Sequence, residues 1–368
     1  MSLDNEIQQA RKSVVSDGYE MSVGEVISLY QQGEITINPD FQRLFRWDLL
    51  RKTRFIESLL LGIPIPPIFV YQDESGVWEL IDGLQRLSTV FEFVGILRSD
   101  DGGVREASVL EGTSFLPSLA GKRWEPSAQN AHDGIGKPQQ LQIKRARIRV
   151  EILKEESDPQ AKYELFQRLN TGGASLSEQE VRNCVAVMID RPFHQWLLEQ
   201  ASLTAFRQTI AQTETAQDKQ AVTELALRFF AFRNVPYTHG LDVHEYLDKA
   251  LLALTSPDRP NLDAEADVFR RTFQLLDRAR GDKVFRKWDG RAFSGKFLMS
   301  VFEVVATGVS KNLDTIEALS TDKQTEFVVQ RCKDLWSDST FTRNNGAGVR
   351  GTTRLANLLP MAGSFFKP

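Results

Sequence analysis

The segment 81–86 (IDGLQR) joins two apolar runs that have different periods. The run before it, 77–81, consists of large and branched residues typical of a strand, whereas the apolar residues after it recur at helical spacing as far as Leu97. This change of period predicts a strand, a tight turn and a helix. Gly83 permits the sharp turn because it has no Cβ.

The start of this predicted helix has the chemistry of an anion site. Backbone N–H groups in a first helical turn have no partner within the helix and attract anions. Gln85 adds a neutral donor and Arg86 a fixed positive fork, a pair that suits a phosphate group. Asp82 would repel a phosphate unless Mg²⁺ or a polarised water lies between them. The alternative is an ordinary helix start that Asp82 caps.

A second Gln-Arg pair, Gln42 with Arg43, stands close to Asp40 in a polar segment. Because each pair lies next to an aspartate, we predict that both converge on one ligand. Arg43 and the turn at Gly83 would then hold phosphates together with Arg86, while Gln42 would orient phosphate or water.

Composition limits the class of protein. The chain has 368 residues, 41% of them hydrophobic, which predicts two domains with substantial cores. Its net charge of -4 argues against a generally basic nucleic-acid coat but permits a local basic groove. Cys184 and Cys332 are far apart, so neither a zinc site nor a disulfide framework is indicated.

Targeting signals and common nucleotide motifs are not found in the sequence. Residues 1–20 are polar, and no run approaches the ~20 apolar residues that a membrane helix needs. We therefore expect a cytoplasmic protein without a membrane segment. No Gly-rich loop ends in Lys-Ser or Lys-Thr, so any nucleotide chemistry is not of the P-loop kind.

Start and stop signals define the elements around the turn. Helices are predicted over 22–32 and from Asp48 to Gly62, and the prolines of 63–67 predict an extended connector. Strands at 68–71 and 77–81 form a predicted hairpin that delivers Asp82 to the turn. Glu57, on the predicted helix before the connector, either faces the cleft that would hold the ligand of the Asp82 turn or is a solvated helical residue.

Three segments in the first half of the chain resemble one known family. It is the family called domain of unknown function 262, the N-terminal domain of GmrSD-type restriction enzymes. The segments that carry the resemblance are 39–43 with Trp47, 56–67 and 82–89, and it resumes at 166–177 with Glu180 and Asn183. Leu84 departs from the family's Asp-Gly-Gln-Gln-Arg motif, where a glutamine is usual.

The resemblance implies a ParB/sulfiredoxin-like nucleotide-binding domain over 1–180. Helical patterns beyond it predict an all-helical domain over 181–368, so we expect an α+β protein. The resemblance also implies binding and GTPase-like hydrolysis of a nucleoside triphosphate with Mg²⁺, which controls DNA restriction in prokaryotic antiviral defence. Asp82, Gln85 and Arg86 would be catalytic, with Asp82 also the metal ligand. Asn170 would border the nucleotide or simply cap a helix C-terminus.

The resemblance also bears on partners. It implies a DNA endonuclease activity, and no His-Asn-His-like nuclease pattern is seen in the C-terminal half. Cleavage would therefore need a partner chain or an activity within the first domain, and a separate nuclease or methyltransferase chain is an expected partner. The alternative is a non-catalytic module that binds DNA or a protein and keeps only a nucleotide-sensing pocket. The Leu84 departure favours this alternative, whereas the retained Asp82 and Gln85 disfavour it.

Charged and apolar residues alternate within 143–153. This pattern predicts a strand with Arg145, Arg147 and Arg149 on one face. These arginines form either a solvated face that protects an edge strand or a phosphate track for DNA.

The C-terminal half shows helical periodicity. Helices are predicted over 192–199, 222–233, 243–254, 264–280, 293–307 and 314–336. The basic, Gly-rich stretch 342–351 with Arg354 is interpreted as a frayed tail or as a mobile arm that contacts a polyanion.

Overall fold

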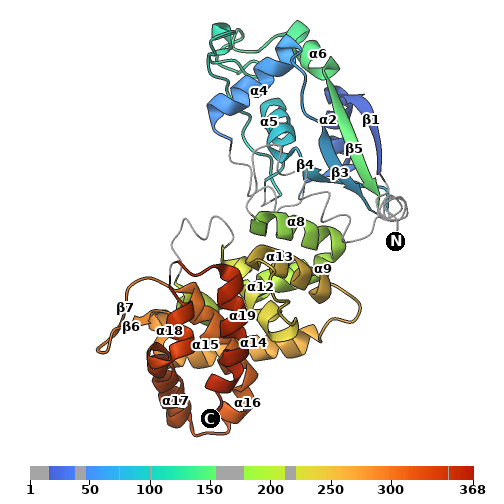
Figure 1. Cartoon of the computed structure of the whole chain (residues 1–368). Helices are drawn as coiled ribbons and strands as arrows, with labels where there is room; N and C mark the ends of the chain where they lie inside the picture. The colour runs from blue at the N-terminus through green and yellow to red at the C-terminus, as the bar shows by residue number, and fades with distance from the viewer. Residues whose placement is uncertain are drawn as a thin grey trace. The chain divides into compact units, whose positions relative to one another are not determined.

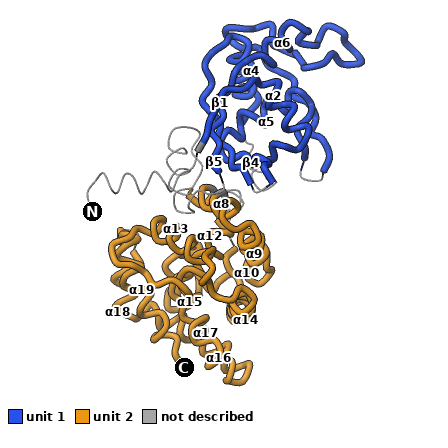
Figure 2. Tube along the Cα trace, turned by 90° about the vertical axis from the view of Figure 1, so that its right-hand side faces the viewer, with its two compact units in different colours: residues 1–174 blue, residues 175–368 orange. Residues whose placement is uncertain are grey.

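The structure of the chain is a computed structural model that describes residues 16–37, 47–73, 75–99, 102–154, 178–211, 221–346 and 348–368. Its contacts divide the chain into two compact units, residues 1–174 and 175–368 (Figure 2). The first unit combines a sheet with helices and the second is mainly helical, so the predicted α+β class is confirmed. The ParB/sulfiredoxin fold and the domain boundary at 180 stay predictions.

The described part of unit 1 contains a mixed five-stranded sheet. In spatial order the strands are β1 (Ser16–Ser22), β5 (Arg147–Lys154), β3 (Ile68–Gln72), β4 (Trp78–Asp82) and β2 (Ile35–Thr36). The β1–β5 and β3–β4 pairs are antiparallel, and the β5–β3 and β4–β2 pairs are parallel. The sheet therefore cannot be a simple meander, because parallel neighbours require crossover connections.

In the described part of unit 1, four helices pack with this sheet around one hydrophobic core. They are α2 (Val23–Gln32), α4 (Leu49–Leu61), α5 (Leu84–Val94) and α6 (Lys137–Arg145). Figure 1 shows α4 and α5 next to each other beside the sheet. Tyr30 of α2 stacks on Phe91 of α5 with ring centroids 4.0 Å apart, which fixes these two helices against each other.

The predicted helix ends are found in the structure. Ser22 accepts the N–H of Glu25 at 3.1 Å, and Glu25 accepts the N–H of Ser22 in return, so α2 begins with a capping box. Asp48 accepts the N–H of Arg51 at 2.8 Å at the start of α4, which ends at Gly62. These local signals confirm the two helices predicted before the hairpin.

The strand, turn and helix predicted around Gly83 are also confirmed. Strand β4 ends at Asp82 and helix α5 begins at Leu84. Gly83 has φ 102°, and a Cβ there would lie 2.5 Å from Cγ2 of Ile68. Glycine is therefore required both for the backbone conformation and for the space above the turn.

The prediction that three arginines share one strand is wrong for Arg145. Helix α6 ends at Arg145, and β5 begins only at Arg147. The N–H of Ala146 still bonds to carbonyls of α6, while its own carbonyl accepts the N–H of Val23 at 2.8 Å. Because this contact from α2 fixes Ala146 at the junction, the alternating pattern spans a helix end and a strand start.

Unit 2 is built from helices whose described apolar faces are buried together. They are α8 (Glu178–Ile189), α9 (Arg191–Ser202), α10 (Thr204–Ile210), α12 (Ala221–Asn234), α13 (Val243–Leu254), α14 (Leu262–Arg280), α15 (Met299–Lys311), α16 (Leu313–Glu317), α17 (Thr321–Asp334), α18 (Ser339–Asn344) and α19 (Gly351–Phe365). Two predictions here are wrong. The predicted helix 314–336 is two helices, α16 and α17, and Phe293 lies in a strand.

That strand makes the prediction of an all-helical second domain wrong in one place. Strand β7 (Phe293–Ser294) pairs antiparallel with strand β6 (Lys287–Trp288) to form a short hairpin between α14 and α15. Aromatic residues at Trp288 and Phe293 face each other across the two strands. Helix α15 therefore begins at Met299 and not at the predicted residue 293.

A buried chain of ion pairs crosses the core of unit 2. Arg182 of α8 has 0% of its side chain exposed and donates to Asp248 at 3.0 Å and to Glu224 at 3.1 Å. Arg228 then donates to Glu224 at 2.6 Å and to Glu303 at 3.4 Å. Such pairs hold one geometry because a buried charge without its partner is costly.

Arg354 closes the same chain of charges. Its guanidinium donates to both carboxylate oxygens of Glu303, at 2.7 and 3.0 Å. Arg354 lies in α19. The interpretation of Arg354 as part of a frayed tail or of a mobile polyanion-binding arm is therefore wrong, because this side chain anchors α19 to α15.

The pKa of Glu224 reflects these surroundings. Burial by itself would raise the pKa of this carboxyl, but the positive charges of Arg228 and Arg182 outweigh burial and hold the pKa below its usual value. Glu224 is therefore ionised in the folded state.

Across the described ranges, none of the helices combines the length and apolarity that a membrane crossing demands.

Candidate functional site

The turn after β4 holds Arg86 in a fixed position. Nη2 of Arg86 lies 2.6 Å from Oδ2 of Asp82, one helical turn earlier, and 3.2 Å from the carbonyl oxygen of Pro67. The Arg86 side chain is 14% exposed and that of Asp82 is 44% exposed. Both bonds use Nη2. Within the described residues Nε and Nη1 have no hydrogen-bond partner, so the N–H groups of these two nitrogens remain as donors for a ligand.

The cap of α5 differs from the ordinary alternative considered for this turn. Gly83 occupies the N-cap position, and the helix has no side-chain cap. Asp82 therefore does not cap α5. Its carboxylate is oriented by Arg86, and its other oxygen, Oδ1, accepts no hydrogen bond from the described residues.

Gln85 connects the turn to the segment that carries the second Gln-Arg pair. Its side-chain oxygen Oε1 accepts the backbone N–H of Trp47 at 3.0 Å. Trp47 directly follows residues 38–46. Gln42, Arg43 and Asn170 lie outside the described residues, so the convergence of both pairs on one ligand stays a prediction. The bond between Gln85 and Trp47 places the described end of the second segment beside the first.

Helix α4 forms a hollow next to Trp47. The hollow has a volume of about 500 Å³ and is lined by Trp47, Arg51, Arg54, Phe55 and Ser58. The rings of Trp47 and Phe55 meet edge to face with centroids 5.7 Å apart. Aromatic surface beside two guanidinium groups suits the base and phosphates of a nucleotide.

The sequence interpretation did not include Arg51 and Arg54 in the site. The signal that identifies them is spacing, because 51, 54 and 58 recur every three or four residues and so share one face of α4, which begins just after Trp47.

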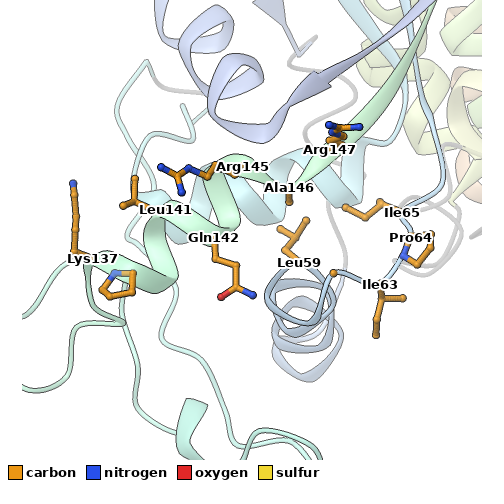
Figure 3. Close-up of a pocket in the computed structure, with 12 residues that line it drawn as sticks. Leu59, Ile63, Pro64, Ile65, Lys137, Leu141, Gln142, Arg145, Ala146 and Arg147 are labelled. Carbon is orange, nitrogen blue, oxygen red and sulfur yellow. The ribbon is translucent and has the colours of Figure 1, made fainter.

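A second, larger pocket of about 740 Å³ lies between α4 and α6 (Figure 3). Arg145 at the end of α6 and Arg147 at the start of β5 border it together with Lys137, and the connector 63–65 lies opposite them. Its walls also include Leu59 and Leu141. The structure thus brings two of the three predicted track residues to one basic rim around an apolar floor.

Arg149 does not line this pocket. Nε of Arg149 lies 2.5 Å from Oε1 of Glu151 on the same strand face. The Arg147 side chain is 82% exposed, and its Nη1 lies 3.7 Å from Oε2 of Glu20 in β1. Arg147 is therefore more available to an anion than Arg149, whose charge is already balanced by a close carboxylate.

Neither prediction for Glu57 is correct. The residue is buried, with 6% exposed, and it accepts a hydrogen bond from the hydroxyl of Thr113. It neither faces the cleft nor is solvated.

Within the described ranges, no group of three or more His, Cys, Asp or Glu side chains could hold a metal ion.

The comparison with protein families agrees with the motifs of unit 1. Residues 23–186 match the family of the GmrSD restriction endonuclease, N-terminal domain. This segment begins with α2, contains the turn at Asp82 and ends inside α8. The resemblance found in the sequence is therefore confirmed over these residues. No curated protein matches the chain.

Proposed function

We propose that unit 1 binds a nucleoside triphosphate at the turn 82–86 and hydrolyses it, and that this turnover controls restriction of DNA in defence against phage. The observation that carries the proposal is the geometry of Arg86. Asp82 and Pro67 hold Nη2, while Nε and Nη1 have no partner within the described residues. These two bonds fix the direction of the guanidinium, so its N–H groups on Nε and Nη1 can donate to phosphate oxygens without first losing rotamer entropy.

Asp82 has two tasks in this proposal. Oδ2 orients Arg86, and Oδ1 accepts a proton from the attacking water or holds Mg²⁺. A single carboxylate fits Mg²⁺ only when the nucleotide supplies most of the other ligands, which is usual for this ion. The bound cation would neutralise phosphate charge. Such a site does not require the three-residue metal cluster that is missing from the described ranges.

Gln85 is a positioning residue in this arrangement. Its side-chain oxygen holds the N–H of Trp47, which keeps Trp47 and the hollow that it lines beside the turn. Arg51 and Arg54 then add positive charge next to the rings of Trp47 and Phe55. The nucleotide base and the distal phosphates would be bound by these two parts of unit 1.

DNA would contact the basic rim at Lys137, Arg145 and Arg147. The rim gives local positive potential to a chain with a net charge of -4. Cleavage of DNA would need a separate partner chain or an activity within unit 1, and the expected partner is a nuclease or a methyltransferase chain.

A second candidate function is a non-catalytic module that binds DNA or a protein and senses a nucleotide. Leu84 favours it, because this residue stands where the family usually has glutamine and is packed, partly buried, against the core of unit 1. Leu84 therefore supplies no polar group to the site. Binding without turnover would distinguish this function from hydrolysis.

The two functions are separated by phosphate release from a panel of nucleoside triphosphates, with and without duplex DNA. We expect release by the wild type and none by Arg86→Ala. Loss of one charge-assisted contact should weaken nucleotide binding by about 1.5–3 kcal/mol, roughly tenfold or more. Arg270→Ala is the matched control, because it removes a helical arginine paired with Asp267 in unit 2. Triphosphate binding without phosphate release would support the sensing module, and equal binding by Arg86→Ala would exclude the proposed site.

A further inference from the structure

The hairpin β6–β7 lies at the edge of unit 2 (Figure 1) and belongs to a basic stretch of the sequence. Residues 280–296 contain six arginines and lysines and two aspartates, a local net charge of +4 (six minus two) in a chain of net charge -4. The six cations are Arg280, Lys283, Arg286, Lys287, Arg291 and Lys296. The hairpin is therefore a local exception to the acidic balance of the chain.

Both aspartates of the hairpin are engaged by their neighbours. Asp289 accepts the N–H groups of Arg291 and Ala292, each at 2.8 Å, and these bonds lower the pKa of its carboxyl. Asp282 pairs with Arg286 at 2.6 Å. By contrast, Lys283, Lys287, Arg291 and Lys296 are exposed and form no ion pair within the described residues. Among the residues that the structure describes, these four positive charges have no carboxylate partner.

Aromatic packing holds the hairpin in place. The rings of Trp288 and Phe293 lie 5.0 Å apart across the two strands, and Phe293 is buried. Arg280 lies over the ring of Phe293 at 5.2 Å, and Lys333 of α17 lies over that of Trp288 at 5.0 Å. The inner face is thus fixed by rings and cations. Lys287, paired with Ser294, occupies the opposite face, because successive side chains of a strand alternate.

From these observations we infer that the hairpin β6–β7 binds the phosphate backbone of duplex DNA. A protein partner would require an apolar interface core, and none of the exposed large hydrophobic residues lies within 281–296. A polyanion requires only accessible cations on a rigid support. A two-stranded ribbon also has dimensions that enter the major groove of DNA. The inference rests on the proposed function, because it assigns the DNA contact of restriction to a second surface.

The test compares two variants of the full chain in duplex DNA binding. The hairpin variant replaces Lys283, Arg291 and Lys296 by Ala and keeps Lys287, whose ammonium lies 5.8 Å from the Trp336 ring. The control variant carries three Ala substitutions at Arg207, Lys249 and Lys323, which are exposed residues of α10, α13 and α17. Both variants lose the same charge, and circular dichroism checks that both are folded.

Affinity for a labelled duplex oligonucleotide is measured by anisotropy over a series of salt concentrations. Each lost phosphate contact should reduce the slope of log affinity against log salt by about 0.9, so the hairpin variant should lose about 2–3 and bind about tenfold more weakly or worse. The control variant should keep the wild-type slope.

Three outcomes would overturn the inference: equal slopes in both variants, no duplex binding by the wild type, or displacement of the duplex by polyglutamate as effectively as by unlabelled duplex. Phosphate release without DNA separates the inference from the proposed function. The hairpin variant should hydrolyse triphosphate at the wild-type rate, whereas a failure of the nucleotide site would abolish release in the wild type also.

Discussion

The backbone N–H of Trp47 donates to Oε1 of Gln85 at 3.0 Å and joins two segments that are 38 residues apart in the chain. Gln85 belongs to the family motif at the turn, and Trp47 ends the segment that carries the second Gln-Arg pair. Because the side chain of Gln85 bonds to a backbone group, it fixes the path of the main chain at Trp47 as well as its own orientation. The nucleotide site proposed for unit 1 depends on this connection.

Asp82→Asn should separate binding from turnover. An asparagine oxygen can still accept from Nη2 of Arg86, so the guanidinium keeps its orientation and nucleotide affinity should change little. The variant loses the charge that would hold Mg²⁺ or accept a proton from water, and hydrolysis should fall by about 10²–10⁴-fold. Equilibrium binding and phosphate release measured on one preparation check this. Full activity of Asp82→Asn would remove Asp82 from the catalytic residues.

Arg43 and Arg86 should be coupled in nucleotide affinity. If both contact one ligand, the loss in the double variant Arg43→Ala/Arg86→Ala should differ from the sum of the single losses. The control pair is Arg86→Ala with Arg270→Ala, whose effects should add because Arg270 lies in unit 2. Simple additivity in both pairs would show that the two Gln-Arg pairs serve separate sites.

The basic rim of the pocket in unit 1 should contribute to DNA binding through Arg145 and Arg147. Their double replacement by Ala should reduce the salt slope of duplex binding by about 2. Arg149→Ala should change it less, because Glu151 already balances this charge at 2.5 Å. Phosphate release without DNA should stay at the wild-type rate. A slope that responds to Arg149 alone would reverse this assignment.

The stability of the protein should decrease in acid through Glu224. The folded-state pKa of Glu224 is lower than its usual value of 4.5, so its ionised form stabilises the fold above that pH. This stabilisation is lost as the pH falls through the lowered folded-state pKa. Glu224→Gln should therefore be less stable near neutral pH and should show a weaker loss of unfolding free energy below pH 4.5. Urea denaturation at a series of pH values measures both effects, and parallel curves for variant and wild type would contradict the assignment.

Elements with strong local signals could be predicted from the sequence. The capping box of Ser22 and Glu25, the cap at Asp48 and the glycine turn at Gly83 each satisfy backbone groups within a few residues, so the sequence nearby is sufficient. The turn residues of the site were found for the same reason. Their hydrogen-bond partners Pro67 and Trp47 were not, because they are distant in the chain.

The errors arose where tertiary contacts decide the structure. At Arg145 an alternating pattern resembled a strand, but the contact between Val23 and Ala146 ends a helix there. The hairpin at Trp288 and Phe293 was missed because each strand has only two residues, too few to show a period. Its signal was the Asp-Gly dipeptide at 289–290 between two aromatic residues.

The position of Arg182 has a practical consequence for dividing the gene. The family segment ends at residue 186, within α8, yet Arg182 of that helix balances Asp248 and Glu224 in the core of unit 2. An expression clone that begins at residue 187 would leave these two carboxylates without their shared counter-ion. A clone that ends at residue 186 would keep Arg182 but lose Asp248 and Glu224, the carboxylates that pair with it in the core of unit 2. Fragments should therefore be cut before α8, so that the helix stays with the residues that neutralise it.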